Sequence, residues 1–324
     1  MNVLLVGLGR WGEKHLRVLT QLGVTVWVAD VSPAGRARAV GQGVAAERAV
    51  EDFRQALPHV EAVDVVTPAD SHRSVAEACL AAGRHCFVEK PLTVSVEDGR
   101  AVAAAARAAG RIVQVGHIFR FHPVTVTLRT ALAAGCIGGV RYATGRFAGF
   151  KRPRTDVGVT HADAIHYFDL FAYLLGREAT AVASVQRDYL GRGLDDMSLT
   201  TVSYGEVPVV VEANYFAPGT HRECVIIGER GALVADFGAS TVTLHAGEHR
   251  RRHDGWDAVD AGKENLPAEG PEPLRVELAA FLEACQGRGD NPVPAEAGVQ
   301  ALEVVEAAGR AARLERSVAI AEVR

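Results

Sequence analysis

Roughly the first 120 residues alternate between short apolar runs and segments whose apolar residues recur at helical spacing. The apolar runs predict buried strands, and the segments between them predict amphipathic helices. The expected strands cover 3–6, 24–29, 62–67, 85–89 and 112–115, and the expected helices include 74–82 and 98–109. Strands that alternate with helices in this way predict a parallel, doubly wound sheet and an α/β fold class.

The pattern changes after Pro123, which is expected to begin a helix. Segments of alternating apolar and polar residues predict strands of a mostly antiparallel sheet at 142–147, 199–204, 207–215 and 223–227. Further helices are expected at 163–175, 273–285 and 295–314. The charged stretch 247–273 contains glycine and proline, and we expect a mobile loop or an irregular excursion there.

Composition limits the class of protein. A chain of 324 residues with 48% hydrophobic and 23% charged residues can bury two cores, and we place the domains at 1–122 and 123–324. The net charge of −4 provides no basic field for nucleic acid or a membrane surface, and the basic cluster 249–253 is interpreted as a solvated loop. Five scattered cysteines lack metal-ligand spacing, so we expect no metal site and no disulfide framework. These features, and a strand at the N-terminus in place of a signal segment, indicate a cytoplasmic protein.

A glycine motif follows the first expected strand. It reads Gly7-Leu8-Gly9-Arg10-Trp11-Gly12 and precedes a helical pattern. Gly7 allows a tight turn, Gly9 lets the backbone approach a pyrophosphate, and Gly12 lets helix and strand pack closely. The alternative is a glycine-rich turn that binds nothing.

Asp30 ends the second expected strand, about 20 residues beyond the glycines. A carboxylate at this position can accept hydrogen bonds from the ribose hydroxyls of NAD, and it repels the 2′-phosphate of NADP. Arg36 and Arg38 follow closely and leave NADP possible, although they fit a solvated helix face better. We therefore predict NAD as the cofactor.

Glu89-Lys90-Pro91 ends the strand 85–89. Ligands in open α/β sheets bind beyond the carboxyl ends of the strands, so Lys90 is expected to point toward a cleft. Oxidation of a secondary alcohol needs a base for the hydroxyl proton as hydride leaves for the nicotinamide. Lys90 suits this task if its pKa is lowered, and His166 suits it because histidine titrates near neutrality. An isolated histidine can equally be a core residue bonded to a backbone carbonyl.

Five motifs in this order carry a resemblance. The glycine motif and Asp30 are followed by Thr67-Pro68 with His72, by Glu89-Lys90-Pro91, by the stretch 116–123 with His117 and Arg120, and by the helix with His166. Over essentially its whole length the chain resembles the Gfo/Idh/MocA oxidoreductases. The stretch 116–121 is also similar to nucleotide-sugar 3-dehydrogenases.

The resemblance implies a Rossmann domain at 1–122, followed at 123–324 by an α+β domain with an open, mostly antiparallel sheet for substrate binding and oligomerisation. It implies a nicotinamide cofactor, a sugar or cyclic polyol as substrate, a cis Lys90-Pro91 bond, and a homo-oligomer, dimer or tetramer, formed through the exposed sheet face. The implied cofactor-binding residues are Gly7, Gly9, Arg10, Trp11, Gly12, Asp30, Thr67, Pro68, His72, Glu89, Lys90 and Pro91. The implied substrate-binding residues are Lys90, His117, Arg120, Arg152, His161, Asp163 and His166.

The chain departs from the family pattern at one position. Family members usually carry an aspartate four residues before the helix histidine, where this chain has Ala162. Asp163 and His161 lie on either side of it, and Asp163 can share a helix face with His166. We predict Lys90, His166 and Asp163 as the catalytic residues.

Several residues keep two interpretations. Thr67 and Pro68 could line the nicotinamide-ribose site or form a simple turn, and His72 could touch the cofactor or begin the next helix. Arg120 could bind a substrate anion or form a salt bridge between the domains. The basic residues before the His166 helix could close over an anionic substrate or be solvated; they are Lys151, Arg152 and Arg154.

Three functions remain open. The leading one is an NAD-dependent dehydrogenase of a sugar, polyol or nucleotide sugar. The second is a glycosidase that retains its NAD and works by oxidation, elimination and re-reduction. The third is a regulator that senses the nucleotide without catalysis, which the presence of Lys90 and His166 disfavours because a sensor needs no proton donor and acceptor.

Overall fold

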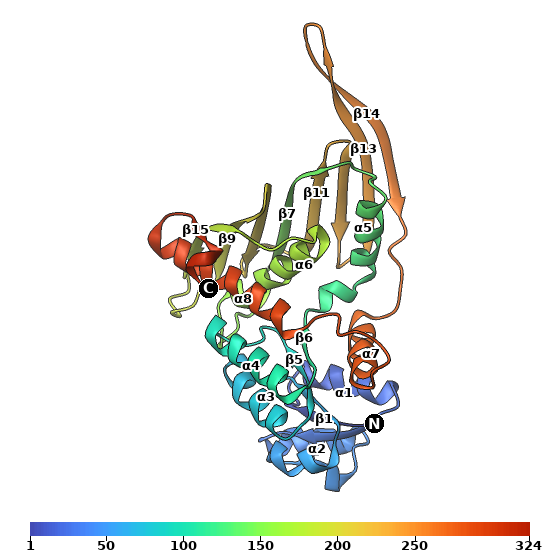
Figure 1. Ribbon diagram of the computed structural model, residues 1–324, viewed down its shortest axis with the longest axis vertical. Coiled ribbons are helices and arrows are strands. Elements are labelled where there is room, and N and C mark those ends of the chain that lie inside the picture. Colours follow the sequence, from blue (N-terminus) through green and yellow to red (C-terminus); the bar gives the residue numbers. More distant parts are fainter. The chain divides into compact units, whose positions relative to one another are not determined.

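The computed structural model describes residues 1–324, and the chain folds into two compact units (Figure 1). The first unit combines Met1–Ile118 with Glu272–Leu302, and the second combines Phe119–Pro271 with Glu303–Arg324. The boundary at residue 302 falls within the helix α8 (Ala295–Leu314). No helix of the structure is both long and apolar enough to span a membrane.

The first unit contains a six-stranded parallel sheet in the order β3-β2-β1-β4-β5-β6. Its strands are β1 (Asn2–Val6), β2 (Thr25–Ala29), β3 (Ala49–Val50), β4 (Ala62–Val65), β5 (His85–Glu89) and β6 (Val113–Gly116). The helices are α1 (Gly12–Gln21), α2 (Pro33–Gly41), α3 (His72–Ala81), α4 (Val96–Ala109) and α7 (Pro273–Cys285). Short 3₁₀ helices complete it at η1 (Ala46–Arg48), η2 (Phe53–Gln55), η3 (Leu57–His59) and η4 (Ala69–Ser71). The strand order reverses between β1 and β4, the switch point where open α/β sheets bind ligands.

The core of the first unit explains why these segments fold together. Apolar residues of β1, including Val3 and Leu5, are fully buried beside Leu16 and Leu19 of α1. The helix α7 returns from far along the chain and adds Leu274, Leu278, Phe281 and Leu282 to the same core. Burying an aliphatic or aromatic side chain of this size stabilises the fold by about 1.5–3 kcal/mol. The glycine loop therefore rests on a rigid base.

The second unit contains a nine-stranded sheet in the order β14-β13-β12-β11-β7-β10-β9-β8-β15. Neighbouring strands are antiparallel except for the parallel pair β7 and β10. The strands are β7 (Val140–Gly149), β8 (Ala181–Arg187), β9 (Met197–Tyr204), β10 (Val207–Asn214), β11 (Thr220–Gly228), β12 (Gly231–Asp236), β13 (Thr241–Arg252), β14 (Gly255–Leu266) and β15 (Val318–Ala319). A mostly antiparallel sheet after a Rossmann sheet confirms the predicted fold class.

The helices α5 (Pro123–Ala133) and α6 (Ile165–Leu175) pack against one face of this sheet. Gly145 of β7 permits the close approach of α6, because a Cβ atom there would lie 2.7 Å from the ring of Tyr167. Shorter helices are η5 (Ile118–Phe121), the π-helix η6 (Thr160–Ala164) and η7 (Ile320–Glu322). The opposite face leaves apolar side chains exposed on four strands: Val185, Leu199, Val210 and Val234, each between 39% and 46% exposed.

The prediction of a loop or irregular excursion at 247–273 is wrong for most of its length. The strands β13 and β14 form a long hairpin that extends past the neighbouring strands (Figure 1). From Glu248 to Val259 the two strands pair only with each other. Both faces of such a ribbon meet solvent, so no apolar alternation marks it in the sequence. The basic cluster 249–253 is exposed, as expected, but it lies mainly on β13.

Candidate active site

The glycine loop between β1 and α1 has the geometry that a dinucleotide requires. Gly7 has a φ of 94°, and a Cβ atom on it would lie 2.7 Å from the carbonyl oxygen of Val66. A Cβ atom on Gly12 would lie 2.1 Å from the carbonyl oxygen of Gly7, so this glycine lets α1 close onto the loop. A Cβ atom on Gly9 would meet open space, which leaves the backbone accessible to a ligand. These residues fit a pyrophosphate at the N-terminus of α1.

Asp30 lies directly beside this loop. One carboxylate oxygen accepts a hydrogen bond from the backbone N–H of Leu8 at 2.7 Å, and the other accepts from Ser32 at 2.8 Å. Gly35 leaves room for the carboxylate, because a Cβ atom there would lie 2.6 Å from its Cγ. The carboxylate is thus held in place while its remaining lone pairs can accept from a ribose.

Arg36 and Arg38 are committed to other groups. Arg36 donates to the carbonyl oxygen of Asp30 at 2.8 Å and lies 3.2 Å from the carboxylate of Glu51. Arg38 donates to the carbonyl oxygen of Leu8 at 2.8 Å and pairs with Glu13 at 2.9 Å. Both guanidinium groups therefore brace the loop and have acidic partners.

His72 begins α3, which was one of the two predicted alternatives. Its ring is buried, with Nε2 lying 2.9 Å from the carbonyl oxygen of Thr67 and Nδ1 lying 2.9 Å from that of Pro91. Both ring nitrogens are occupied, so His72 joins the loops after β4 and β5. The Lys90-Pro91 bond is cis, as the resemblance implied.

Glu89 connects the end of β5 to the glycine loop. The indole N–H of Trp11 donates to Oε1 of Glu89 at 2.7 Å, and the backbone N–H of Lys90 donates to Oε2 at 3.1 Å. Two further residues belong to the surroundings of Glu89, and they were not predicted from the sequence. His15 of α1 lies 3.2 Å from Glu89 and 2.8 Å from Asp64 of β4. A charged residue inside a buried apolar strand, as Asp64 is, was the available signal.

His166 is buried on α6 among aromatic rings. Its imidazole stacks on Phe147 at a centroid distance of 5.1 Å and on Phe119 at 4.9 Å. Phe147 also carries the guanidinium of Arg222, 3.3 Å above its ring. Burial lowers the pKa of Arg222 from its usual value, although the Asp163 charge opposes this effect. Packing therefore fixes the plane of the His166 ring.

Asp163 lies on the π-helix that precedes α6. The buried carboxylate pairs with Lys151 at 2.8 Å. Asp195 anchors the first turn, because its carboxylate accepts from the backbone N–H of Thr160 at 2.9 Å and from its hydroxyl at 2.6 Å. π-Turns occur frequently at functional sites, and this one alters the simple helical spacing assumed between Asp163 and His166. Asp195 was also missed, since nothing near it in the sequence marked it.

Arg120 forms a bidentate salt bridge with Asp169 of α6, with distances of 2.8 and 2.5 Å. Both residues belong to the second unit, so this bridge does not join the two units as the alternative interpretation supposed. The side chain of Arg120 is largely buried, and its charge is balanced. We therefore treat Arg120 as a positioning residue.

The basic residues before α6 differ in their surroundings. Lys151 pairs with Asp163 and lies 4.9 Å above the ring of Phe147. Arg154 pairs with Asp156, whereas Arg152 is exposed. Of the three, only Arg152 extends into solvent without such a carboxylate partner.

The predicted site residues divide between the two units. The first unit holds Gly7, Gly9, Arg10, Trp11, Gly12, Asp30, Thr67, Pro68, His72, Glu89, Lys90, Pro91 and the buried His117. The second unit holds Arg120, Arg152, His161, Asp163 and His166. Within each unit the structure brings the main members together: the glycine loop with Asp30 and Glu89, and the π-helix with α6.

Two family models match the chain. Residues 1–117 match the model described as an oxidoreductase family with an NAD-binding Rossmann fold, and residues 129–320 match the C-terminal α/β domain of the same family. The chain belongs to the Gfo/Idh/MocA oxidoreductase family. This assignment confirms the resemblance and the predicted NAD-binding oxidoreductase.

Relatives in the family include several sugar and polyol dehydrogenases. Inositol 2-dehydrogenase 1 of Saccharopolyspora erythraea is 31% identical over 333 residues, covering 96% of this chain and 94% of the relative. The scyllo-inositol 2-dehydrogenase (NAD(+)) of Bacillus subtilis is 30% identical, covering 70% of this chain and 71% of the relative. The solved UDP-N-acetylglucosamine 3-dehydrogenase of Acidithiobacillus ferrooxidans has a TM-score of 0.84 and 22% identity, covering 97% and 98% of the two chains.

Asp30 generates a prediction about cofactor choice. The enzyme should bind NADH more tightly than NADPH, because the fixed carboxylate favours ribose hydroxyls and repels a 2′-phosphate. Titration of nicotinamide fluorescence with both reduced cofactors measures the difference. Asp30→Ala should narrow it, whereas Asp290→Ala, which removes an exposed carboxylate near the start of β6, at the sheet edge opposite the glycine loop, should leave it unchanged. Equal or tighter binding of NADPH by the unmodified enzyme would refute the assignment.

Proposed function

We propose that this enzyme is an NAD-dependent dehydrogenase that transfers hydride between the nicotinamide and a secondary alcohol of a sugar, polyol or nucleotide sugar. The observation that carries the proposal is the hydrogen bond from Trp11 in the glycine loop to Glu89. It ties the loop that receives the cofactor to the residue next to Lys90. Lys90, the proposed proton-transfer group, is thus connected through Glu89 to the loop that receives the cofactor.

NAD, when bound, supplies the hydride acceptor at C4 of the nicotinamide. In the proposal, Gly7, Gly9 and Gly12 receive the pyrophosphate, and Asp30 accepts from the adenosine ribose. Arg10 and Trp11 flank the pyrophosphate, while Thr67 and Pro68 line the nicotinamide ribose. His72 acts indirectly, because its ring holds the Thr67 and Pro91 carbonyls.

Lys90 and His166 share the proton chemistry. When a secondary alcohol is oxidised, the C–H bond breaks and its electron pair leaves as hydride, while the O–H proton passes to a base. We assign this exchange to the amine of Lys90 and the imidazole of His166. Reduction of the ketone uses the same groups in reverse. Asp163 and His161 are the residues next to Ala162 that could orient His166 in place of the usual family aspartate.

The substrate class rests on the relatives and on charge. Named relatives oxidise inositols and a UDP-amino sugar, so a ring with neighbouring hydroxyls is the common feature. Lys151 and Arg222 supply positive charge close to Phe147, and Arg152 adds an exposed cation. We propose that these cations favour a substrate that carries an anionic group.

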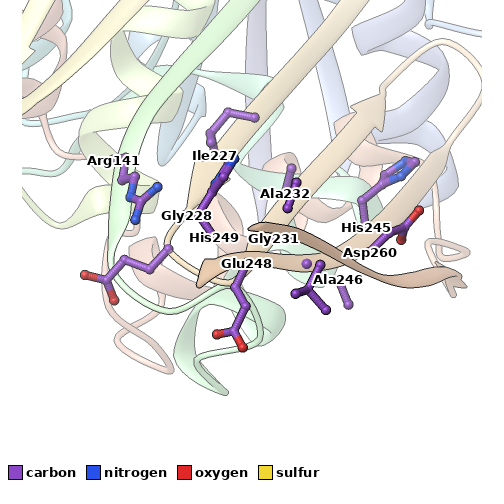
Figure 2. Close-up of a pocket in the computed structure, with 14 residues that line it drawn as sticks. Arg141, Ile227, Gly228, Gly231, Ala232, His245, Ala246, Glu248, His249 and Asp260 are labelled. Atoms are coloured by element: carbon purple, nitrogen blue, oxygen red, sulfur yellow. The ribbon is translucent and has the colours of Figure 1, made fainter. Parts of the chain in front are cut away.

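A second copy of the chain is the proposed partner, in a dimer or tetramer. Exposed valine and leucine side chains on four strands give the open face of the sheet an apolar character that a solvated sheet face normally lacks. A hollow of about 400 Å³ lies on the same unit, and its lining includes Arg141, Ile227, Ala232, His245 and Asp260 (Figure 2). None of the predicted catalytic residues lines this hollow.

A cytoplasmic location of the protein also stays a prediction.

Turnover with candidate substrates tests the function directly. The full-length enzyme is incubated with NAD and a panel of polyols, aldoses and UDP-sugars, and NADH formation is followed by absorbance. Steady NADH formation with one class supports the dehydrogenase. Cleavage of a glycoside without net NADH would identify the NAD-retaining glycosidase, and NAD binding without any turnover would favour the sensing regulator.

Lys90 generates the sharpest kinetic prediction. Lys90→Ala should retain NADH binding and lose about 10²-fold or more in kcat, the usual effect of removing an acid–base group. Lys90→Arg should fail as well, because a guanidinium stays charged and exchanges no proton near neutral pH. Fluorescence titration and steady-state kinetics give the two quantities. Lys263→Ala, an exposed lysine on β14, is the matched control and should behave as the unmodified enzyme. Full activity in Lys90→Ala would show that the proposed role is wrong.

Asp163 should tune His166. If the carboxylate stabilises the protonated imidazole, Asp163→Asn should lower kcat and move the acidic limb of the pH–rate profile to lower pH, because removal of a neighbouring negative charge lowers a histidine pKa. His161→Ala should then have a smaller effect. The measurements are the pH–rate profile and the melting temperature. A less stable Asp163→Asn enzyme with an unmoved profile would mean that Asp163 only pairs with Lys151 and supports the π-helix.

Val210, on the interior strand β10, tests the proposed partnership with a second copy of the chain. Val210→Glu should convert the oligomer to monomers, because a carboxylate cannot be buried without a partner in an apolar interface. Val126→Glu on α5, which lies on the helix-covered side of the sheet, is the matched control and should keep the oligomer. Light scattering coupled to gel filtration measures the mass. A monomeric unmodified protein at micromolar concentration would contradict the proposal.

A further inference from the structure

Three ionisable side chains are buried together in the first unit: His15, Asp64 and Glu89. His15 is 0% exposed and places Nδ1 at 2.8 Å from Asp64 and Nε2 at 3.2 Å from Glu89. They come from α1, β4 and β5, so a single imidazole connects three elements at the switch-point side of the sheet. Nδ1 is hydrogen-bonded to Asp64, and Nε2 lies near Glu89 without the alignment of a hydrogen bond. Two acidic groups beside one buried ring favour its imidazolium form.

Burial favours the neutral form of His15 and lowers its pKa, but the two carboxylates outweigh this effect and raise it to about 10. This direction favours the protonated, positively charged ring at neutral pH. Burial alone would raise the pKa of Glu89, and the bond and charge of His15, the charge of Lys90 and the Trp11 indole together hold it below the usual value. Glu89 is consequently a carboxylate that attracts the Lys90 ammonium.

Electrostatic influence between Glu89 and Lys90 is mutual. The negative charge of Glu89 raises the pKa of the Lys90 amine, and a positive charge next to Glu89 offsets part of that field. His15 provides this positive charge from the interior, where water screens it little. The same ring neutralises the repulsion between the two buried carboxylates, which would otherwise be costly.

We propose that His15 is a positioning residue: its imidazolium holds Glu89 against the glycine loop and tunes the basicity of Lys90. The inference rests on the proposed function only for its consequence in catalysis, since the ion contacts exist without it. Trp11 and His15 act on the same Glu89 oxygen, Oε1, from the loop and from α1. The other oxygen, Oε2, accepts from the Lys90 backbone and fixes the strand end.

Removal of a nearby positive charge and removal of a nearby negative charge should shift the pKa of Lys90 in opposite directions. In His15→Gln the cation is lost, and Asp64 is expected to take up a proton because it loses its bond to His15, while Glu89 keeps Trp11 and the Lys90 N–H as donors. The pKa of Lys90 should then rise by on the order of half a unit or more. In Glu89→Gln the attracting carboxylate is lost, and the pKa of Lys90 should fall.

The chain has four lysines, Lys14, Lys90, Lys151 and Lys263, so each amine can be followed separately. Competitive labelling of the full-length protein with trace acetic anhydride over a pH series, followed by mass spectrometry, gives the apparent pKa of Lys90 without any turnover. Exposed Lys263 is the internal reference, and His59→Gln, a surface histidine of the same unit, is the matched control. The control should leave Lys90 unmoved.

The expected result is an upward shift in His15→Gln and a downward shift in Glu89→Gln. Unmoved labelling in both variants, or shifts in the same direction, would overturn the inference. If His15→Gln does not fold, ¹H–¹⁵N NMR of the unmodified protein at pH 8 decides, with His15 assigned through its contact with the Phe87 ring. A doubly protonated ring supports the inference, and a neutral ring refutes it.

Steady-state kinetics separates this inference from the proposed function. Loss of turnover in Lys90→Ala with no shift of Lys90 in His15→Gln would leave the dehydrogenase intact and reject the role of His15. Shifts of Lys90 in the expected directions, with full turnover in Lys90→Ala, would establish the electrostatic link and reject the catalytic role of Lys90.

Discussion

The carboxylate of Glu89 is the group on which the first unit's site depends. It is almost fully buried at the end of β5, yet it receives the Trp11 indole, the His15 ring and the Lys90 backbone. In a parallel sheet the carboxyl ends of the strands lie on one edge, but side-chain contacts decide whether loops on that edge hold a fixed geometry. Glu89 supplies these contacts. It joins the end of β5 to the loop after β1, although β4 lies between these two strands in the sheet.

In the second unit, aromatic packing sets the orientation of the candidate site residue His166. His166 gains its orientation from aromatic rings of β7 and η5, and α6 approaches β7 closely because Gly145 has no side chain. Charges are arranged around this packed centre: Arg120 with Asp169, and Lys151 with Asp163. Stacking sets the ring plane, and the ion pairs hold the helix and the preceding loop against it. Each unit therefore holds its own candidate site residues in a fixed arrangement.

Local sequence patterns predicted most of the elements because the strands of the Rossmann sheet are buried on both faces and most strands of the second sheet on one. The helix 273–285 was predicted with its observed bounds. Its place in the core of the first unit was not, because that depends on the packing of α7 against α1 and on contacts between residues 255 positions apart, such as Arg17 and Glu272. The β13–β14 hairpin lacked any pattern, since solvent meets both its faces. Motif positions identified Asp30 and Glu89, but His15, Asp64 and Asp195 act through contacts that no local spacing reveals.

Stability alone gives a weak reason for the charged cluster around His15. Taking three ionisable groups out of water carries a desolvation penalty that ion pairing often fails to recover, and apolar replacements of similar volume are frequently as stable. Ordinary packing would place an aliphatic side chain at Asp64, between the apolar residues Val63 and Val65 of a buried strand. A charge at such a position contributes through its electrostatic effect on neighbouring groups. Here the charges of His15 and Asp64 act on Glu89, and through Glu89 on the amine of Lys90. The desolvation penalty in the core of the first unit is therefore accompanied by control over the protonation of Lys90.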